Sequence, residues 1–208
     1  YKRQEQMEPL VCAYLATLPT TEREEDWRDV GMEKPEGVVE KFVYAGIEPK
    51  STSRLVFSGP FEFDGWKNNF AIDAMAAVLQ IKLREVLRED LGGTYGVGVS
   101  ASVEHFPREE YSVNIGFSSD PERTDELTQV VFEQIDSLKS VGTTQVYVDK
   151  VKEIRKRTRE VSLKENSFWR GALQGLYIDG TDPRLLLQYD ALVDELTPEI
   201  VQQAAQQY

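Results

Sequence analysis

The chain has 208 residues, of which 40% are hydrophobic and 10% aromatic, and this composition predicts a folded globular protein with a sizeable core. No apolar run reaches the ~18 residues that a transmembrane helix requires, so the sequence predicts no membrane span. The formal net charge of -12 disfavours a nucleic-acid partner, because binding to phosphates needs clustered Lys and Arg side chains.

The N-terminal quarter of the chain predicts a helix, a linker and two strands. Apolar residues at helical spacing predict a helix that runs to about Leu18, where Pro19 ends it. Residues 20–37 are charged and contain Pro and Gly without any period, so we expect a linker there. Residues 38–44 and 54–58 are predicted to be neighbouring strands.

The rest of the chain predicts a long helix over residues 65–89, an antiparallel hairpin of strands over 94–103 and 111–117, and then helices. Further helices are expected to begin near Asp120, Thr144, Asp182 and Thr197, and proline follows three of these four residues. The helix from Thr144 either continues to about residue 176 or breaks near residue 166. This order predicts an α+β fold, with an antiparallel or mixed β-sheet covered by helices.

The long helix has two unlike faces on a helical wheel. One face is a core stripe of large apolar residues, namely Ile72, Met75, Leu79, Leu83 and Val86. The opposite line begins with small and apolar residues and ends in two arginines: Phe70, Ala74, Ala77, Ile81, Arg84 and Arg88. We therefore expect this second face to be covered, either by another helix of the same domain or by a partner domain or substrate cavity.

Arg88 closes the long helix and Tyr95 opens the next strand, with Gly92 and Gly93 in the turn between them. Each has an ordinary structural explanation, since an arginine suits the negative end of a helix and a tyrosine suits a packed strand. The glycines do not form a phosphate loop, because no Lys-Ser/Thr follows and the segment leads into a strand. From these residues alone, the pair is two hydrogen-bond donors of unknown purpose.

Cys12 and His105 are the only cysteine and histidine, so the sequence offers no internal disulfide and no catalytic Cys–His or Ser–His pairing. Zinc sites use several nitrogen or sulfur ligands, and we therefore predict no metal site in this chain. His105 precedes Phe106 and Pro107 and is predicted to be a turn residue.

The turn segment resembles a known family at this point. Its sequence, Leu87-Arg88-Glu89-Asp90-Leu91-Gly92-Gly93-Thr94-Tyr95, is similar to the Leu-Arg-Glu-x-x-Gly-Gly/Leu-x-Tyr segment in the non-catalytic half of insulinase/pitrilysin-family zinc peptidases. Residues 14–19, 44–51, 117–123 and 164–169 also resemble the bacterial periplasmic branch of that family, so the resemblance covers nearly all of the chain from residue 14.

The resemblance implies an enzyme built from homologous αβ domains in two halves. The N-terminal half would carry zinc on an inverted His-x-x-Glu-His motif, whose Glu activates the zinc-bound water. The C-terminal half holds no zinc and would supply Arg88 and Tyr95. By that match both side chains bind the peptide substrate near the scissile bond, so we expect a substrate-binding role for them and no catalytic residue in this chain.

This chain cannot contain the zinc motif, because it has one histidine. The resemblance therefore implies a C-terminal, non-catalytic domain that needs no cofactor of its own, partners the zinc-bearing N-terminal half and is inactive alone. We expect residues 1–19 to close a preceding domain, residues 20–37 to be a linker and residues 38–208 to form the peptidase-like domain. The expected compartment is the periplasm, and a final strand is expected beyond Tyr208. The alternative is a structural or peptide-binding subunit of an inactive paralogue.

Overall fold

The computed structural model describes residues 3–23, 26, 28–64, 66–90, 92, 94 and 96–208. The chain divides into two compact units, residues 1–33 and 34–208. In the first unit, helix α1 (Gln4–Tyr14) contains Pro9 and has no buried side chain. It ends four residues before the predicted end at Leu18: the amide of Ala16 bonds to the carbonyl oxygen of Val11 at 3.1 Å, which closes the helix. The helix has no buried apolar face, and such packing is what usually stabilises further helical turns.

Three strands form the sheet in the described part of the second unit: β1 (Ser51–Pro60), β2 (Val97–Glu104) and β3 (Glu110–Ser119). Their order is β1-β3-β2 and both pairings are antiparallel, so the predicted hairpin is confirmed. Ile115 at the centre of β3 lies opposite Leu55 of β1 and Val99 of β2. Facing residues in such a ladder point to the same side of the sheet, and these three point to the core.

The predicted strand over residues 38–44 is wrong. These residues are irregular, and their apolar side chains are exposed, with Val38 at 93% and Tyr44 at 92%. A strand needs a neighbour for its backbone groups, and the ladders among the described residues pair β1 only with β3. Alternating apolar residues without a partner or a core therefore did not form a strand.

The helices begin close to their predicted starts. Helix α2 spans Lys67–Arg84 and continues as the π-helix η1 (Glu85–Asp90), and the short 3-10 helix η2 (Pro121–Arg123) leads into α3 (Thr124–Ser140). The open question at residue 166 is settled in favour of a break, since α4 spans Gln145–Ser162 and α5 spans Asn166–Ile178. The chain then forms η3 (Pro183–Gln188), α6 (Tyr189–Glu195) and α7 (Pro198–Gln207).

Two of the expected helix starts carry side-chain caps. The hydroxyl of Thr197 accepts a hydrogen bond from the amide of Ile200 at 3.3 Å, and the carboxylate of Asp182 accepts one from the amide of Arg184 at 2.9 Å. Asp120 has the extended conformation of a cap residue but makes no such bond.

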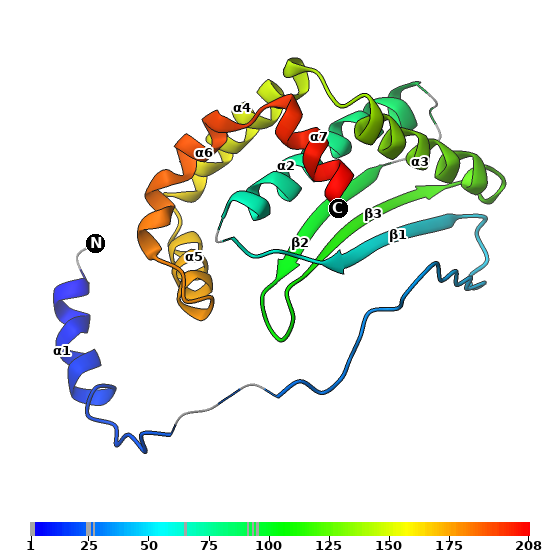
Figure 1. The fold of residues 1–208 in the computed structure, drawn as a ribbon. Coiled ribbons are helices and arrows are strands. Elements are labelled where there is room, and N and C mark those ends of the chain that lie inside the picture. The colour runs from blue at the N-terminus through cyan, green and yellow to red at the C-terminus, as the bar shows by residue number, and fades with distance from the viewer. Residues whose placement is uncertain are drawn as a thin grey trace. The chain divides into compact units, whose positions relative to one another are not determined.

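Helices α2, α3 and α7 lie together on one face of the sheet (Figure 1). They bury a continuous core whose largest fully enclosed side chains include Ile72, Leu83, Leu87, Ile115, Leu127 and Val131. On the other face, β2 presents Gly98, Ser100, Ser102 and Glu104, which are all exposed. The fold is therefore α+β, an antiparallel sheet covered by helices, as predicted.

The second face of α2 is covered by other helices of its own domain. Phe70 and Ala74 are buried, the guanidinium of Arg155 on α4 lies 4.4 Å from the ring of Phe70, and Tyr189 of α6 meets the same ring edge-on at 5.5 Å. Of the two explanations that the sequence left open, the structure supports a helix of the same domain for this part of the face. Only its end, with Arg84 and Arg88, is exposed.

Candidate functional site

Arg88 lies in the π-helix rather than in a continuous α-helix, which corrects the predicted wheel beyond Arg84. A π-helical turn accommodates an extra residue and occurs often at functional sites. Leu87 is fully buried at 0% exposure, whereas the side chain of its neighbour Arg88 is exposed. The turn is therefore held to the core by one residue and presents a guanidinium at the surface with the next.

The first residue of this turn, Glu85, is bound by two side chains of α4. The hydroxyl of Tyr147 donates to one carboxylate oxygen at 2.5 Å, and Nζ of Lys150 donates to the other at 3.1 Å. The hydrogen bond from Tyr147, with a smaller contribution from Lys150, keeps the pKa of Glu85 below its ordinary value. Sequence reasoning missed this cluster, because 62 residues separate Glu85 from Tyr147.

Lys82 extends the cluster by one helical turn. Its ammonium donates to the backbone carbonyl of Gly142 at 3.4 Å and lies 5.7 Å from the ring of Tyr147, and the ammonium of Lys150 lies 4.9 Å from the same ring. Burial lowers the pKa of Lys82, an effect that the charge of Glu85 opposes. Glu85 is thus a carboxylate between two lysines and a tyrosine.

Tyr95, the second predicted substrate-binding residue, lies outside the described residues, as do Leu91 and Gly93. The flanking residues are described. Gly92 has a φ of +57°, a conformation that glycine adopts without strain. Thr94 is buried at 8% exposure, and its hydroxyl both donates to the carbonyl of Gly96 at 2.9 Å and accepts from its amide at 3.1 Å.

The described residues do not fit a catalytic zinc ion. His105 begins the loop between β2 and β3, where its ring stacks on Phe63 at 4.4 Å and its Nδ1 lies 3.0 Å from a carboxylate oxygen of Glu109. Cys12 is exposed on α1. Within the described ranges, no group of three or more His, Cys, Asp or Glu residues could hold a metal ion.

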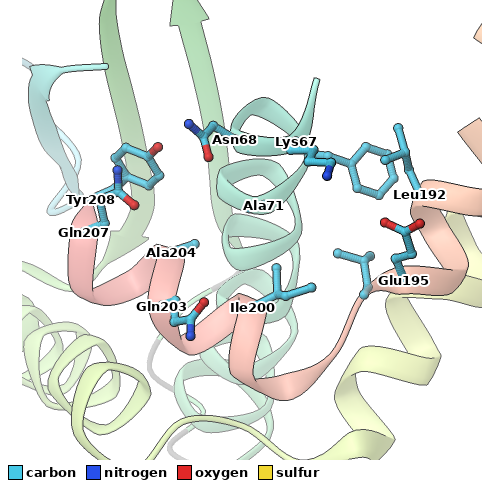
Figure 2. Close-up of a pocket in the computed structure, with 12 residues that line it drawn as sticks. Lys67, Asn68, Ala71, Leu192, Glu195, Ile200, Gln203, Ala204, Gln207 and Tyr208 are labelled. Carbon is cyan, nitrogen blue, oxygen red and sulfur yellow. The ribbon is translucent and has the colours of Figure 1, made fainter. Parts of the chain in front are cut away.

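A pocket of about 300 Å³ lies between the first turns of α2 and the helices α6 and α7 (Figure 2). Its floor is apolar, with Ala71, Leu192 and Ile200, and polar side chains such as Asn68 and Gln203 lie around it. The charged side chains of Lys67 and Glu195 also line the pocket. The pocket adjoins the start of α2, whereas Arg88 follows its end, so the two belong to different ends of the domain.

The helices that the structure describes include none with the length and apolar character needed to cross a membrane.

The chain matches a family model described as the Peptidase M16 inactive domain over residues 3–155. A protein of Arabidopsis thaliana named "Zinc protease PQQL-like" is 25% identical over 178 residues, which are 77% of this chain and 18% of that protein.

Two solved bacterial proteases share the fold. The periplasmic protease PqqL from Escherichia coli has a TM-score of 0.67 and 22% identity, over 77% of this chain and 18% of that one. A protease from Helicobacter pylori has a TM-score of 0.75 and 18% identity, over 99% of this chain and 49% of that one. The chain spans 18% of the length of the Arabidopsis relative and of PqqL.

Proposed function

Because this chain belongs to the inactive-domain family of insulinase-type zinc proteases, we propose that it helps to enclose and hold the peptide substrate of a larger zinc endopeptidase. In this role it is the C-terminal, zinc-free domain, and the zinc ion and the attacking water belong to the N-terminal half. The chain alone then cleaves no peptide. Support comes from the family match over residues 3–155 and from the single histidine, which cannot provide a zinc motif.

We propose Arg88 and Tyr95 as the substrate-holding residues. A guanidinium carries five N–H donors and a phenol carries one, and both can bind a peptide carbonyl or the oxyanion that develops from it. Donors of this kind contribute about 3 kcal/mol each in the transition state. The observation that carries the proposal is the exposed guanidinium of Arg88 on a turn held by the buried Leu87. The role of Tyr95 rests on its sequence spacing from Arg88.

The proposed organisation also gives the N-terminal residues a role. Residues 1–19 would close the preceding domain, residues 20–37 would link it to this one, and residues 38–208 would form the C-terminal domain. The proposed compartment is the periplasm, since PqqL from Escherichia coli is described as a periplasmic protease.

The test uses the protease with its N-terminal half present and compares peptide turnover in the wild type, Arg88→Ala and Tyr95→Phe. Each substitution should lower kcat/KM by roughly 100-fold, because each removes one transition-state donor. Arg84→Ala is the matched control for Arg88, since Arg84 is also exposed and lies one turn earlier. Tyr177→Phe is the control for Tyr95→Phe, since Tyr177 lies on α5 and is 72% exposed. Unchanged turnover in both Arg88→Ala and Tyr95→Phe would contradict the proposal.

The alternative is a peptide-holding or structural subunit of an inactive paralogue. In that case the domain has the same fold but belongs to a protein that cleaves no peptide. The single histidine of this chain supports the alternative function when no partner supplies a zinc motif. Reading the coding sequence upstream of Tyr1, and identifying any copurifying subunit, separates the two functions. A His-x-x-Glu-His motif in either place supports the protease, and its absence from both supports the inactive subunit.

A further inference from the structure

The helix that leads to Arg88 is fastened to α4 at two separate points. Near its start, Nη2 of Arg155 lies 2.6 Å from a carboxylate oxygen of Asp73. Where the α-helix becomes a π-helix, Glu85 accepts hydrogen bonds from Tyr147 and Lys150. The partners occur in opposite order along the two helices, so α2 and α4 run antiparallel. Both fastenings therefore join the same pair of helices, but only the second lies beside Arg88.

The second fastening involves the same π-helical turn that carries Arg88. In an α-helix, side chains three residues apart are neighbours, so Glu85 and Arg88 would be placed to form an ion pair with each other. A π-helical turn contains more residues, so each residue rotates less about the helix axis and the third residue stops short of the face on which Glu85 lies. Glu85 is directed instead to Tyr147 and Lys150 on α4, and Arg88 is exposed.

The contacts of Glu85 make this arrangement hard to exchange for another. Its carboxylate has a hydroxyl donor on one oxygen and an ammonium donor on the other, and Lys82 adds a second positive charge. Leu87, two residues later, is fully buried. Rotation of the turn would have to break the pair of hydrogen bonds and expose Leu87 together, so the direction of the following side chain is fixed by both.

We propose that Glu85 is a positioning residue for Arg88: bound by Tyr147 and Lys150, it holds the π-helical turn in the orientation that presents the guanidinium to a peptide substrate. The inference rests on the proposed substrate-holding role of Arg88. Glu85 touches no substrate, and its effect on turnover passes entirely through Arg88.

The test measures kcat/KM of the protease, with its N-terminal half present, for Glu85→Ala in the wild-type background and in the Arg88→Ala background. A displaced donor keeps only part of its effect, so Glu85→Ala should lower kcat/KM by roughly 10-fold in the wild type, less than the loss on removing Arg88. In the Arg88→Ala background the further loss should stay below about 2-fold, because the effects of a coupled pair do not add. Asp73→Ala is the matched control: it removes the other carboxylate that ties α2 to α4, and it should change kcat/KM by less than about 2-fold.

Two milder variants keep the test sharp if Glu85→Ala lowers the unfolding temperature enough to obscure turnover. Tyr147→Phe removes one hydroxyl, and Glu85→Gln keeps an acceptor for Tyr147 while removing the charge that attracts Lys150. Each should lower kcat/KM by about 3-fold, and only when Arg88 is present.

Each outcome has a defined meaning. A loss of equal size in both backgrounds, or an equal loss in Asp73→Ala, would show a purely structural role for Glu85 and overturn the inference. A loss in Arg88→Ala with no loss in Glu85→Ala or Tyr147→Phe would overturn the inference and leave the proposed function intact. Wild-type turnover in Arg88→Ala would overturn both.

Discussion

The side-chain amide of Gln80 on α2 pairs with the backbone on either side of Gly98 as a neighbouring strand would. Its Nε2 donates to the carbonyl of Val97 at 2.8 Å, and its Oε1 accepts from the amide of Val99 at 2.5 Å. These backbone groups lie on the edge of β2 that β3 leaves free. One glutamine therefore satisfies part of an open sheet edge and fixes the start of β2, two residues after Tyr95 in the sequence.

Replacing Gln80 with Ala should lower the free energy of unfolding by about 2 kcal/mol, because a partly buried carbonyl and amide lose their partner. Urea unfolding of the 208-residue chain measures this loss. Gln206→Ala is the control, since Nε2 of Gln206 also donates to a backbone carbonyl, that of Lys139 at 2.8 Å, but from an exposed position. Its cost should stay below about 1 kcal/mol. Equal losses in the two variants would show that the hydrogen bonds of Gln80 at the strand edge contribute no more to the free energy of unfolding than an exposed hydrogen bond does.

The guanidinium of Arg159 on α4 contacts three other helical segments, α5, α6 and η3, and lies over an aromatic ring of each of the first two. It lies 4.8 Å from the ring of Phe168 on α5 and 4.6 Å from that of Tyr189 on α6, and it donates to the carbonyl of Leu186 at 2.8 Å. Lysine cannot stack as a plane, so Arg159→Lys should cost about 1 kcal/mol in thermal or denaturant unfolding. Arg157→Lys, at an exposed position of the same helix, should leave stability unchanged. If Arg159→Lys leaves the stability unchanged, the positive charge alone accounts for the contribution of Arg159.

The pKa of Glu85 is lower in the folded chain than its usual value of 4.5, chiefly because Tyr147 donates to the ionised form. The ionised form therefore stabilises the folded state, and this contribution is complete above pH 4.5 and is lost as the pH falls through the lowered pKa. The stability difference between the wild type and Glu85→Gln should thus stay constant from neutral pH down to 4.5 and shrink as the pH falls below 4.5. Denaturant unfolding across this range measures the difference. A difference that stays constant with pH would contradict the assignment.

The purified chain should contain no stoichiometric zinc and should cleave no peptide, because the described residues provide no zinc ligand cluster and the sequence has a single histidine. Elemental analysis after exhaustive dialysis, together with a fluorogenic peptide assay, tests both statements. One zinc ion per chain accompanied by cleavage would require a catalytic centre within these 208 residues.

Local patterns sufficed where local forces decide the structure. The alternation along residues 94–103 and 111–117 led to the hairpin of β2 and β3, because these strands pair with each other and face the same core. The same alternation failed over residues 38–44, where Val38 and Tyr44 are exposed and unpaired in the described ladders. Periodicity reports which side chains could be buried, and it does not report whether a partner strand is present.

The site was predicted less completely than the fold. The resemblance singled out Arg88, and the structure places it on an exposed turn. The change from α-helix to π-helix at Glu85 has no pattern in the sequence, since Leu83 and Leu87 keep an ordinary helical spacing. The partners of Glu85 on α4 follow from tertiary packing between segments 62 residues apart, which no local propensity encodes.

The open face of the sheet has few large side chains along its β2–β3 half. Gly98, Ser100 and Ser102 lie opposite Gly116, Asn114 and Ser112, so a chemical reporter attached there would not disturb the core. Cys12 is the only thiol in the chain and is exposed, so replacing it with Ser clears the background for a single label. With Ser100→Cys in that background, a fluorophore on β2 would report directly when another polypeptide covers this face of the sheet.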